Sequence, residues 1–95
     1  MSVINVQRRH QLSLIDLRKK IDAIIIDIGE RFEFRTEWES DCLLTFRRKG
    51  ASGNIKIDEN KFELTLRLGM MFKSLKNVIE SEVVSAVDSN LNRKE

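Results

Sequence analysis

Few residues of the sequence belong to types that can carry out chemistry, and they are scattered along the chain. His10 is the only histidine and Cys42 the only cysteine, which excludes sites built from two or more of either type. We expect the His10 imidazole either to donate a hydrogen bond to a ligand or, as the simpler interpretation, to bond to a backbone carbonyl or to water. No glycine-rich phosphate loop or nucleophile elbow is present. The sequence therefore predicts no enzyme, no metal site and no cofactor.

Trp38 and Arg48 are the other side chains that could contact a small ligand. Trp38 is the only indole of the chain and falls on the inward face of a predicted strand. Core packing is the simpler role for it, and the wall of an apolar pocket is the alternative. Arg48 and His10 would stand at the mouth of such a pocket. Cys42 is expected opposite Trp38 as a small buried residue.

Three carboxylates, Glu37, Glu39 and Asp41, surround one predicted hairpin. They could bind a cation, but hard cations usually gather more oxygen ligands than one short turn supplies. We therefore expect a solvated acidic loop at this position.

The composition describes one compact globular domain. The 95 residues, 41% hydrophobic and 34% charged with no proline, suit a single core over residues 1–95 with a frayed tail at 92–95. The lone cysteine favours a reducing cytoplasm over a disulfide-bonded secreted domain. The longest apolar run, 23–26, is far too short to span a bilayer, so no transmembrane segment is expected.

Hydrophobic periodicity predicts an α+β fold with the element order β-α-β-β-β-β-α. Alternation marks a first strand over 2–8, and Ser13 is expected to cap a helix that covers about 14–31. A second helix is expected over about 74–90. We predict an antiparallel sheet of about five strands with both helices packed on one face. The position of the first strand in this sheet stays open.

Pairing arithmetic predicts the register of the four consecutive strands. The expected cross-strand pairs are Trp38 with Cys42, Phe34 with Phe46, Phe46 with Ile55, Ile55 with Leu64, and Ile57 with Phe62. A four-residue turn at 49–52, with permissive backbone at Gly50 and Gly53, would join the middle two strands. A slip of one residue would turn every inward side chain outward. In this register apolar residues face apolar residues, which supports it.

The two predicted helices carry more apolar residues than packing against one sheet requires, and the additional residues form a candidate interaction surface. It comprises Ile15, Ile26, Val84, Val87 and Leu91. These side chains could join the helices to each other, or they could bind a partner protein or a second protomer of a homo-oligomer.

The core-facing residues of the second helix are expected to start soon after the last strand ends. Its predicted members are Leu75, Val78, Ile79, Val83 and Ala86. The Met70-Met71-Phe72 junction is interpreted as an apolar hinge, with an adaptable contact surface as the alternative.

The charges argue against nucleic-acid binding. Seventeen Lys and Arg against fifteen Asp and Glu leave a net charge of only +2. The outward face of the predicted sheet mixes Arg35 and Arg67 with Glu37 and Glu63, and it has no aromatic side chain on which a base could stack. We interpret this mixture as a solubility feature and expect an anionic surface or acidic partner only at the basic turn 47–49.

Several short motifs recur together over almost the whole chain. They are I-x-V-x-R-x-H-x-L from Ile4 to Leu12, W-x-x-D at Trp38 and Asp41, G-x-x-G at Gly50 and Gly53, L-G at Leu68 and Gly69, and L-K-x-x-I-E from Leu75 to Glu80. Their joint spacing resembles the bacterial polyhydroxyalkanoic acid system protein family, small proteins that the family name associates with polyester storage granules. Ser13 and Ser40 depart from this pattern at positions where we expect glycine.

The resemblance implies a non-enzymatic accessory protein of polyhydroxyalkanoate storage metabolism. Such a protein would reside in the cytoplasm, at storage granules, and would bind a granule surface, a granule protein or itself. The alternative is a small apolar or acyl ligand-binding domain with a pocket between the sheet and the helices. The family has no reaction that carries over to this chain.

Overall fold

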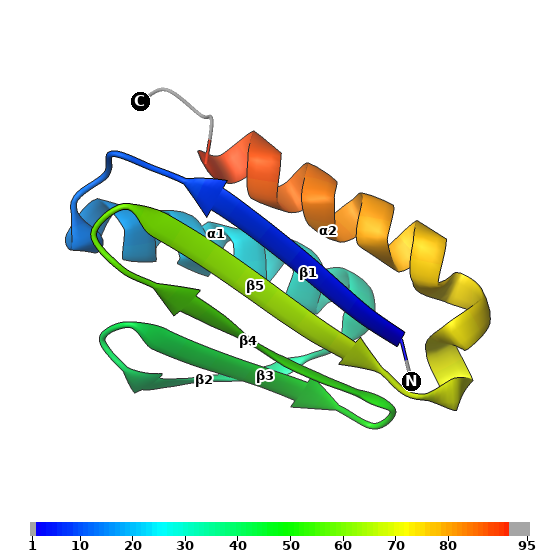
Figure 1. The fold of residues 1–95 in the computed structure, drawn as a ribbon. Helices are drawn as coiled ribbons and strands as arrows, with labels where there is room; N and C mark the ends of the chain where they lie inside the picture. Colours follow the sequence, from blue (N-terminus) through cyan, green and yellow to red (C-terminus); the bar gives the residue numbers. More distant parts are fainter. Residues whose placement is uncertain (1, 92–95) are drawn as a thin grey trace.

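The computed structural model describes residues 2–91, so the predicted fraying of 92–95 lies outside the described residues. The elements follow the predicted order β-α-β-β-β-β-α, which confirms the α+β class (Figure 1). The strands are β1 (Ser2–Arg9), β2 (Arg35–Ser40), β3 (Leu43–Arg48), β4 (Ala51–Ile57) and β5 (Lys61–Leu68). The helices are α1 (Leu14–Phe32) and α2 (Lys76–Leu91), and a 3-10 helix, η1 (Met70–Leu75), leads from β5 into α2.

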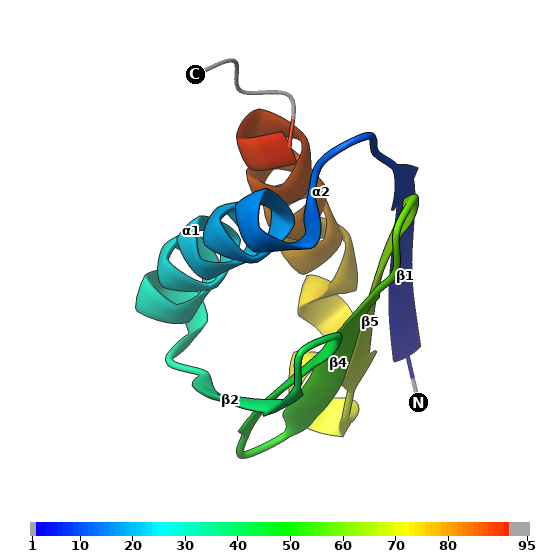
Figure 2. The same cartoon turned by 90° about the vertical axis from the view of Figure 1, so that its left-hand side faces the viewer.

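The sheet has the spatial order β1-β5-β4-β3-β2, with every neighbouring pair antiparallel. β1 forms one edge and pairs with β5 along its whole length, from Ser2 opposite Leu68 to Arg9 opposite Lys61. The connection through α1 carries the chain from this edge to the opposite edge, where β2 lies. Both helices cover the same face of the sheet, as predicted, and leave the other face uncovered (Figure 2).

α1 begins and ends where its capping residues dictate. The Ser13 hydroxyl accepts a hydrogen bond from the Asp16 backbone N–H at 3.2 Å, which satisfies a donor of the first turn. At the other end Glu33 adopts a left-handed conformation with φ 57°, and its N–H donates to the Gly29 carbonyl. The predicted helix over 14–31 is therefore confirmed, with one further residue at its end.

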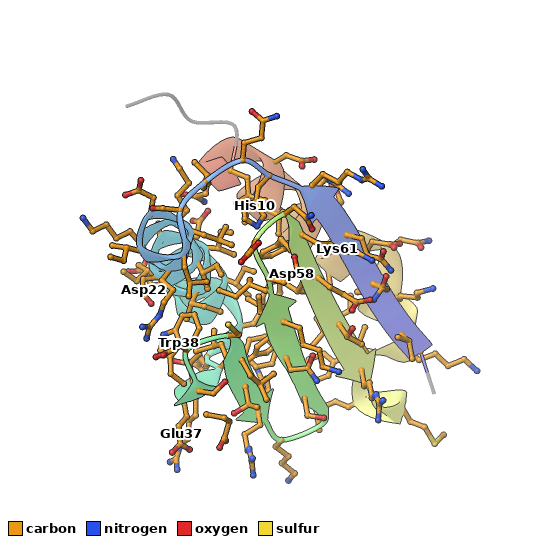
Figure 3. The ribbon with its side chains drawn as sticks, turned by 60° about the vertical axis from the view of Figure 1, so that its left-hand side comes forward. His10, Asp22, Glu37, Trp38, Asp58 and Lys61 are labelled. Carbon is orange, nitrogen blue, oxygen red and sulfur yellow. The ribbon has the colours of Figure 1, made fainter. Side chains whose placement is uncertain are left out.

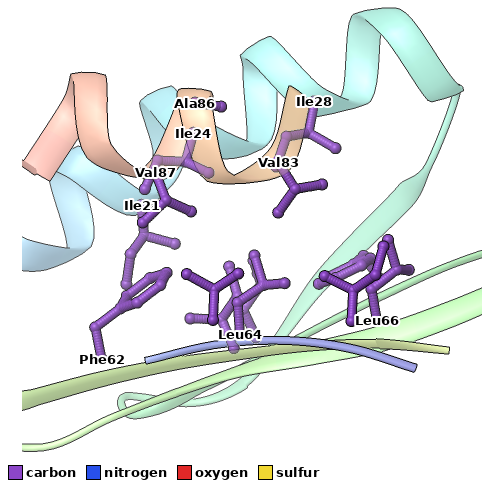
Figure 4. Close-up of a cluster of buried hydrophobic side chains, with 14 of the residues drawn as sticks. Ile21, Ile24, Ile28, Phe62, Leu64, Leu66, Val83, Ala86 and Val87 are labelled. Carbon is purple, nitrogen blue, oxygen red and sulfur yellow. The ribbon is translucent and has the colours of Figure 1, made fainter. Parts of the chain in front are cut away.

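One apolar core fills the space between the sheet and the two helices (Figure 4). α1 contributes Leu17, Ile21, Ile24 and Ile28, α2 contributes Ile79, Val83, Ala86 and Val87, and the sheet contributes the inward residues of β1, β3, β4 and β5. Removing these side chains from water is the main source of stability in a domain of this size.

The first turn of the second helix faces differently from the prediction. Leu75 and Val78, expected in the core, are exposed, and the buried stripe starts at Ile79. Leu75 ends η1, in which no residue is buried. Val78 lies about 100° from Ile79 around the α2 axis, on the side away from Val83 and Val87, so the buried stripe leaves it in water. Met70 and Met71, expected in an apolar hinge, are exposed as well.

The predicted strand register is correct at one hairpin and displaced at two. Ile57 faces Phe62 as expected, but Phe46 faces Thr36 and Gly53 in place of Phe34 and Ile55. Each displacement arises at its own hairpin. The β3–β4 turn has two residues, Lys49 and Gly50, and not the predicted four, and the β2–β3 pairing has a register irregularity between Trp38 and Ser40. A displacement of two residues keeps every side chain on its predicted face, because the side-chain period of a strand is two.

Gly53 is a packing requirement of this register and not a turn residue. A Cβ placed on it would collide with the Thr65 carbonyl oxygen and would lie 2.8 Å from the Phe46 ring. The aromatic ring therefore occupies the space that a side chain on β4 would otherwise fill.

We expect opposite effects from two glycine-to-alanine substitutions. Gly53→Ala should lower the free energy of unfolding by about 2–3 kcal/mol, because the new methyl group overpacks the sheet against Phe46. Gly29→Ala should raise it by about 0.5–1 kcal/mol, because its methyl group meets nothing within 4 Å and alanine favours the helix. Urea denaturation measures both, and equal effects of the two substitutions would contradict the packing at Gly53.

Candidate functional site

The His10 ring bridges two connections of the fold. Its Nδ1 accepts a hydrogen bond from the Leu12 N–H at 3.2 Å, and its Nε2 lies 2.9 Å from the Asp58 carbonyl oxygen (Figure 3). The neutral tautomer with its proton on Nε2 satisfies both contacts. The ring ties the β1–α1 connection to the β4–β5 turn, in agreement with the simpler interpretation of a linker imidazole.

Arg48 serves a similar structural purpose at the other end of the sheet. Its Nη1 donates to the Phe32 carbonyl at 2.6 Å, where α1 ends, and its Nε donates to the Lys49 carbonyl at 3.3 Å. The guanidinium carbon also lies 4.9 Å from the centre of the Phe72 ring. Arg48 thus joins α1, β3 and η1, and much of its donor capacity is used within the fold.

Trp38 joins the β2–β3 hairpin to α1 at the edge of the core. Its Nε1 donates to the Asp22 carboxylate at 3.3 Å, and the Arg18 guanidinium stacks 4.4 Å from the ring centre (Figure 3). Arg18 also approaches Asp41 at 3.6 Å. The expected partner of Trp38 was wrong, because the displaced register places Leu44 opposite it and leaves Cys42 exposed in the turn.

The three candidate ligand contacts therefore do not converge on one pocket. His10 engages the β4–β5 turn, Trp38 engages α1, and Arg48 engages the end of α1. The pocket between the sheet and the helices at Phe34, Phe72 and Ile79 measures about 10 Å³. Binding sites for small molecules usually enclose several hundred Å³, so this pocket is too small for an acyl ligand.

The predicted helical interaction surface also separates into parts. Val87 is fully buried, and Val84 and Leu91 are half-buried against the core, because α2 packs on the sheet and on α1 at the same time. Ile15 and Ile26 remain exposed at 71% and 61%. They lie eleven residues apart on α1, a separation of roughly 16 Å along its axis. Val87 in particular cannot contact a partner of the folded protein.

A different set of exposed apolar side chains is grouped at η1 and the start of α2. This η1 patch consists of Met70, Met71, Leu75 and Val78, with exposed fractions of 91%, 58%, 47% and 59%. All four lie within residues 70–78, over η1 and the first turn of α2. The Met71 sulfur and the Phe72 ring lie against Gly50 at the β3–β4 turn. The adjacent methionines were the sequence signal for this surface. Its extent was missed because Leu75 and Val78 were predicted to face the core.

Arg8 and Asp88 form a two-pronged ion pair that connects β1 to α2. The Arg8 Nε donates to one carboxylate oxygen at 2.7 Å and its Nη2 to the other at 3.2 Å. The hydrogen bond from Arg8 holds the pKa of Asp88 below its ordinary value of 3.8, and charge attraction adds to it. Arg8 and His10 thus both hold the end of β1 in place.

The match to known proteins covers the same span as the fold. The model of the polyhydroxyalkanoic acid system protein family matches residues 4–91. None of the curated proteins matches the chain. Within residues 2–91 no helix combines the length and apolar character needed to cross a bilayer.

We expect Asp88→Asn to destabilise the protein in a pH-dependent way. Both side chains are more than a third exposed, so solvent screening limits the loss at pH 7 to about 0.5–1 kcal/mol. Because the pKa of Asp88 is lowered by folding, the ion pair stabilises fully above pH 3.8 and loses its effect as the pH falls through the lower, folded-state value. Wild type and variant should therefore converge in unfolding free energy on acidification.

A double-mutant cycle with Arg8→Gln isolates this contribution. Urea denaturation at pH 7 and at a series of values down to about pH 2 should give a coupling energy between the two positions that is constant above pH 3.8 and declines below it. A coupling energy that is zero at pH 7, or that rises on acidification, would show that the pair does not stabilise the fold.

Proposed function

Because the chain belongs to the polyhydroxyalkanoic acid system protein family, we propose that it is a non-enzymatic accessory protein that docks directly on the polyester of polyhydroxyalkanoate storage granules. The η1 patch is the single observation that carries the proposal. A cytoplasmic location at the granule surface is part of the same proposal.

The side chains of the η1 patch suit a surface without a fixed shape. Methionine is unbranched and polarisable, so Met70 and Met71 can adapt to an irregular apolar polymer. Their neighbours Leu75 and Val78 extend the apolar area, and the segment 70–78 carries two lysines and no acid. An apolar group of this kind on a small soluble domain usually marks a contact surface.

The described side chains also support a role in binding and not in catalysis. The Cys42 thiol is exposed in a turn, and both ring nitrogens of His10 are occupied by backbone groups. A nucleophile for making or cleaving polyester requires an adjacent base, and Cys42 has no described hydrogen bond to one.

Co-sedimentation with protein-free polyhydroxyalkanoate particles tests the proposal. The triple variant Met70→Gln/Met71→Gln/Leu75→Gln should bind the particles about tenfold more weakly, because it removes much of the apolar area that contact would bury. The matched control is Ile15→Gln/Ile26→Gln, which removes exposed apolar residues from α1 and should retain wild-type binding. All five positions are exposed, so both variants should fold normally in thermal unfolding.

Two outcomes would contradict direct docking through η1. Loss of particle binding in the α1 variant but not in the η1 variant would place the contact on α1. Failure of the wild-type protein to sediment with bare particles, combined with capture by a granule protein or self-association dependent on η1, would identify a protein as the occupant of the patch.

A further inference from the structure

The uncovered face of the sheet sorts its charges by cross-strand row. In the row nearest the β3–β4 turn, Arg35 faces Arg47, Arg47 faces Ser52, and Ser52 faces Arg67. This arginine row spans four strands and contains no acidic residue. Its members form no hydrogen bond or ion pair with other residues of the described range 2–91 through their guanidinium groups.

The acids of this face lie elsewhere or are engaged. Glu63 accepts hydrogen bonds from Asn5 and Gln7, and Glu39 accepts one from Thr45. The acids nearest to the row, Glu33 and Glu37, lie on its β2 side, where Glu33 lines a hollow with Arg35 and Arg47 and Glu37 is a diagonal neighbour of Arg47. No acidic residue faces Arg47, Ser52 or Arg67 directly across the sheet.

Two arginines directly opposite each other on neighbouring strands are unfavourable without an anion. Like charges at such positions repel and destabilise a sheet, and Arg35 faces Arg47 in this way. An oxyanion bound to the row would remove this repulsion. This repulsion concerns Arg35 and Arg47; the case for an anion at Arg47 and Arg67 rests on the hollow that both line and on guanidinium groups that have no partner among residues 2–91.

The geometry of the row suits one phosphate group. Adjacent strands are about 4.8 Å apart, so the backbones of Arg47 and Arg67 lie roughly 10 Å apart on either side of Ser52. Two arginine side chains can reach across that interval and present their paired N–H groups to a single anion. Arg47, Ser52, Asn54 and Arg67 all line an open hollow of about 660 Å³.

We propose that this hollow binds the phosphate group of a phosphorylated small molecule or of a lipid headgroup. Arg47 and Arg67 clamp the phosphate oxygens from the two sides, and the Ser52 hydroxyl donates from the floor between them. A nucleic acid is disfavoured because the face has no aromatic side chain for base stacking. The proposal does not rest on granule binding, since the η1 patch and the arginine row share no residue.

Titration of the 15N-labelled protein with inorganic phosphate and with glycerol 3-phosphate tests the site. Chemical shift changes should centre on Arg47, Ser52 and Arg67, and the affinity should fall as sodium chloride is raised. The variant Arg47→Gln/Arg67→Gln should weaken binding by about tenfold or more, because two charge-assisted contacts are lost. Thermal unfolding of the variant at or above the wild-type midpoint shows that the loss is not caused by misfolding.

The matched control is Arg9→Gln/Lys61→Gln. Arg9 and Lys61 face each other on the same side of the sheet, at its opposite end, so the control removes the same charge from a different place. It should change phosphate affinity by less than about twofold, as expected for charges beyond a Debye length. Equal weakening by both variants, or no saturable binding to any phosphate, would overturn the proposal.

Vesicles distinguish the two sources of phosphate. Binding to phosphatidylcholine vesicles that contain phosphatidic acid, but not to pure phosphatidylcholine, identifies a lipid headgroup if Arg47→Gln/Arg67→Gln abolishes it. Saturation by glycerol 3-phosphate without vesicle binding identifies a soluble phosphorylated ligand. Vesicle binding that persists in this variant but disappears in the η1 variant would exclude a lipid headgroup at the arginine row, and it would overturn the arginine site if neither inorganic phosphate nor glycerol 3-phosphate binds there.

Discussion

The two-residue reversal at Lys49 and Gly50 is the constraint on which the surfaces of this protein depend. Gly50 adopts φ 87°, a conformation that costs glycine little, and the chain can therefore turn between Arg48 and Ala51 without further residues. The turn sets which residues of β3 and β4 face each other. On the inner face it brings Phe46 over Gly53, and on the outer face it aligns Arg47 with Ser52.

The same turn anchors the segment that follows β5. The Gly69 N–H donates to the Gly50 carbonyl at 2.8 Å, and η1 starts at the next residue. No residue of η1 is buried, and the buried stripe of α2 begins only at Ile79, so the apolar side chains of the junction point to water. The η1 patch and the arginine row consequently lie at the same end of the sheet, one beside the helical layer and the other on the uncovered face.

The residues that the sequence marks as candidate ligand contacts have structural roles at the edge of the core. His10 and Arg8 hold the end of β1, Trp38 holds the β2 hairpin against α1, and Arg48 holds the end of α1. Each uses its polar atoms within the fold, which is the usual arrangement for partly buried polar groups. The motifs that carry the family resemblance therefore consist mainly of residues that hold the fold together. Most of the surface residues that support a function lie outside these motifs.

The element order, the capped start of α1, the inward face of every strand and the family were all determined by the sequence, because periodicity and capping act within a few residues. The sequence alone did not determine the pairing of β3, the edge position of β1 or the exposure of Leu75 and Val78. Each of these depends on a turn geometry or on a long-range contact between elements. Arg35, Arg47 and Arg67 illustrate the consequence. Along the chain they are far apart, Arg35 between two glutamates and Arg47 in a basic turn, and only the register of four strands brings them into one positive row. Likewise Val87 is predicted to lie on a surface beyond the core, but it is buried because α2 contacts both α1 and the sheet.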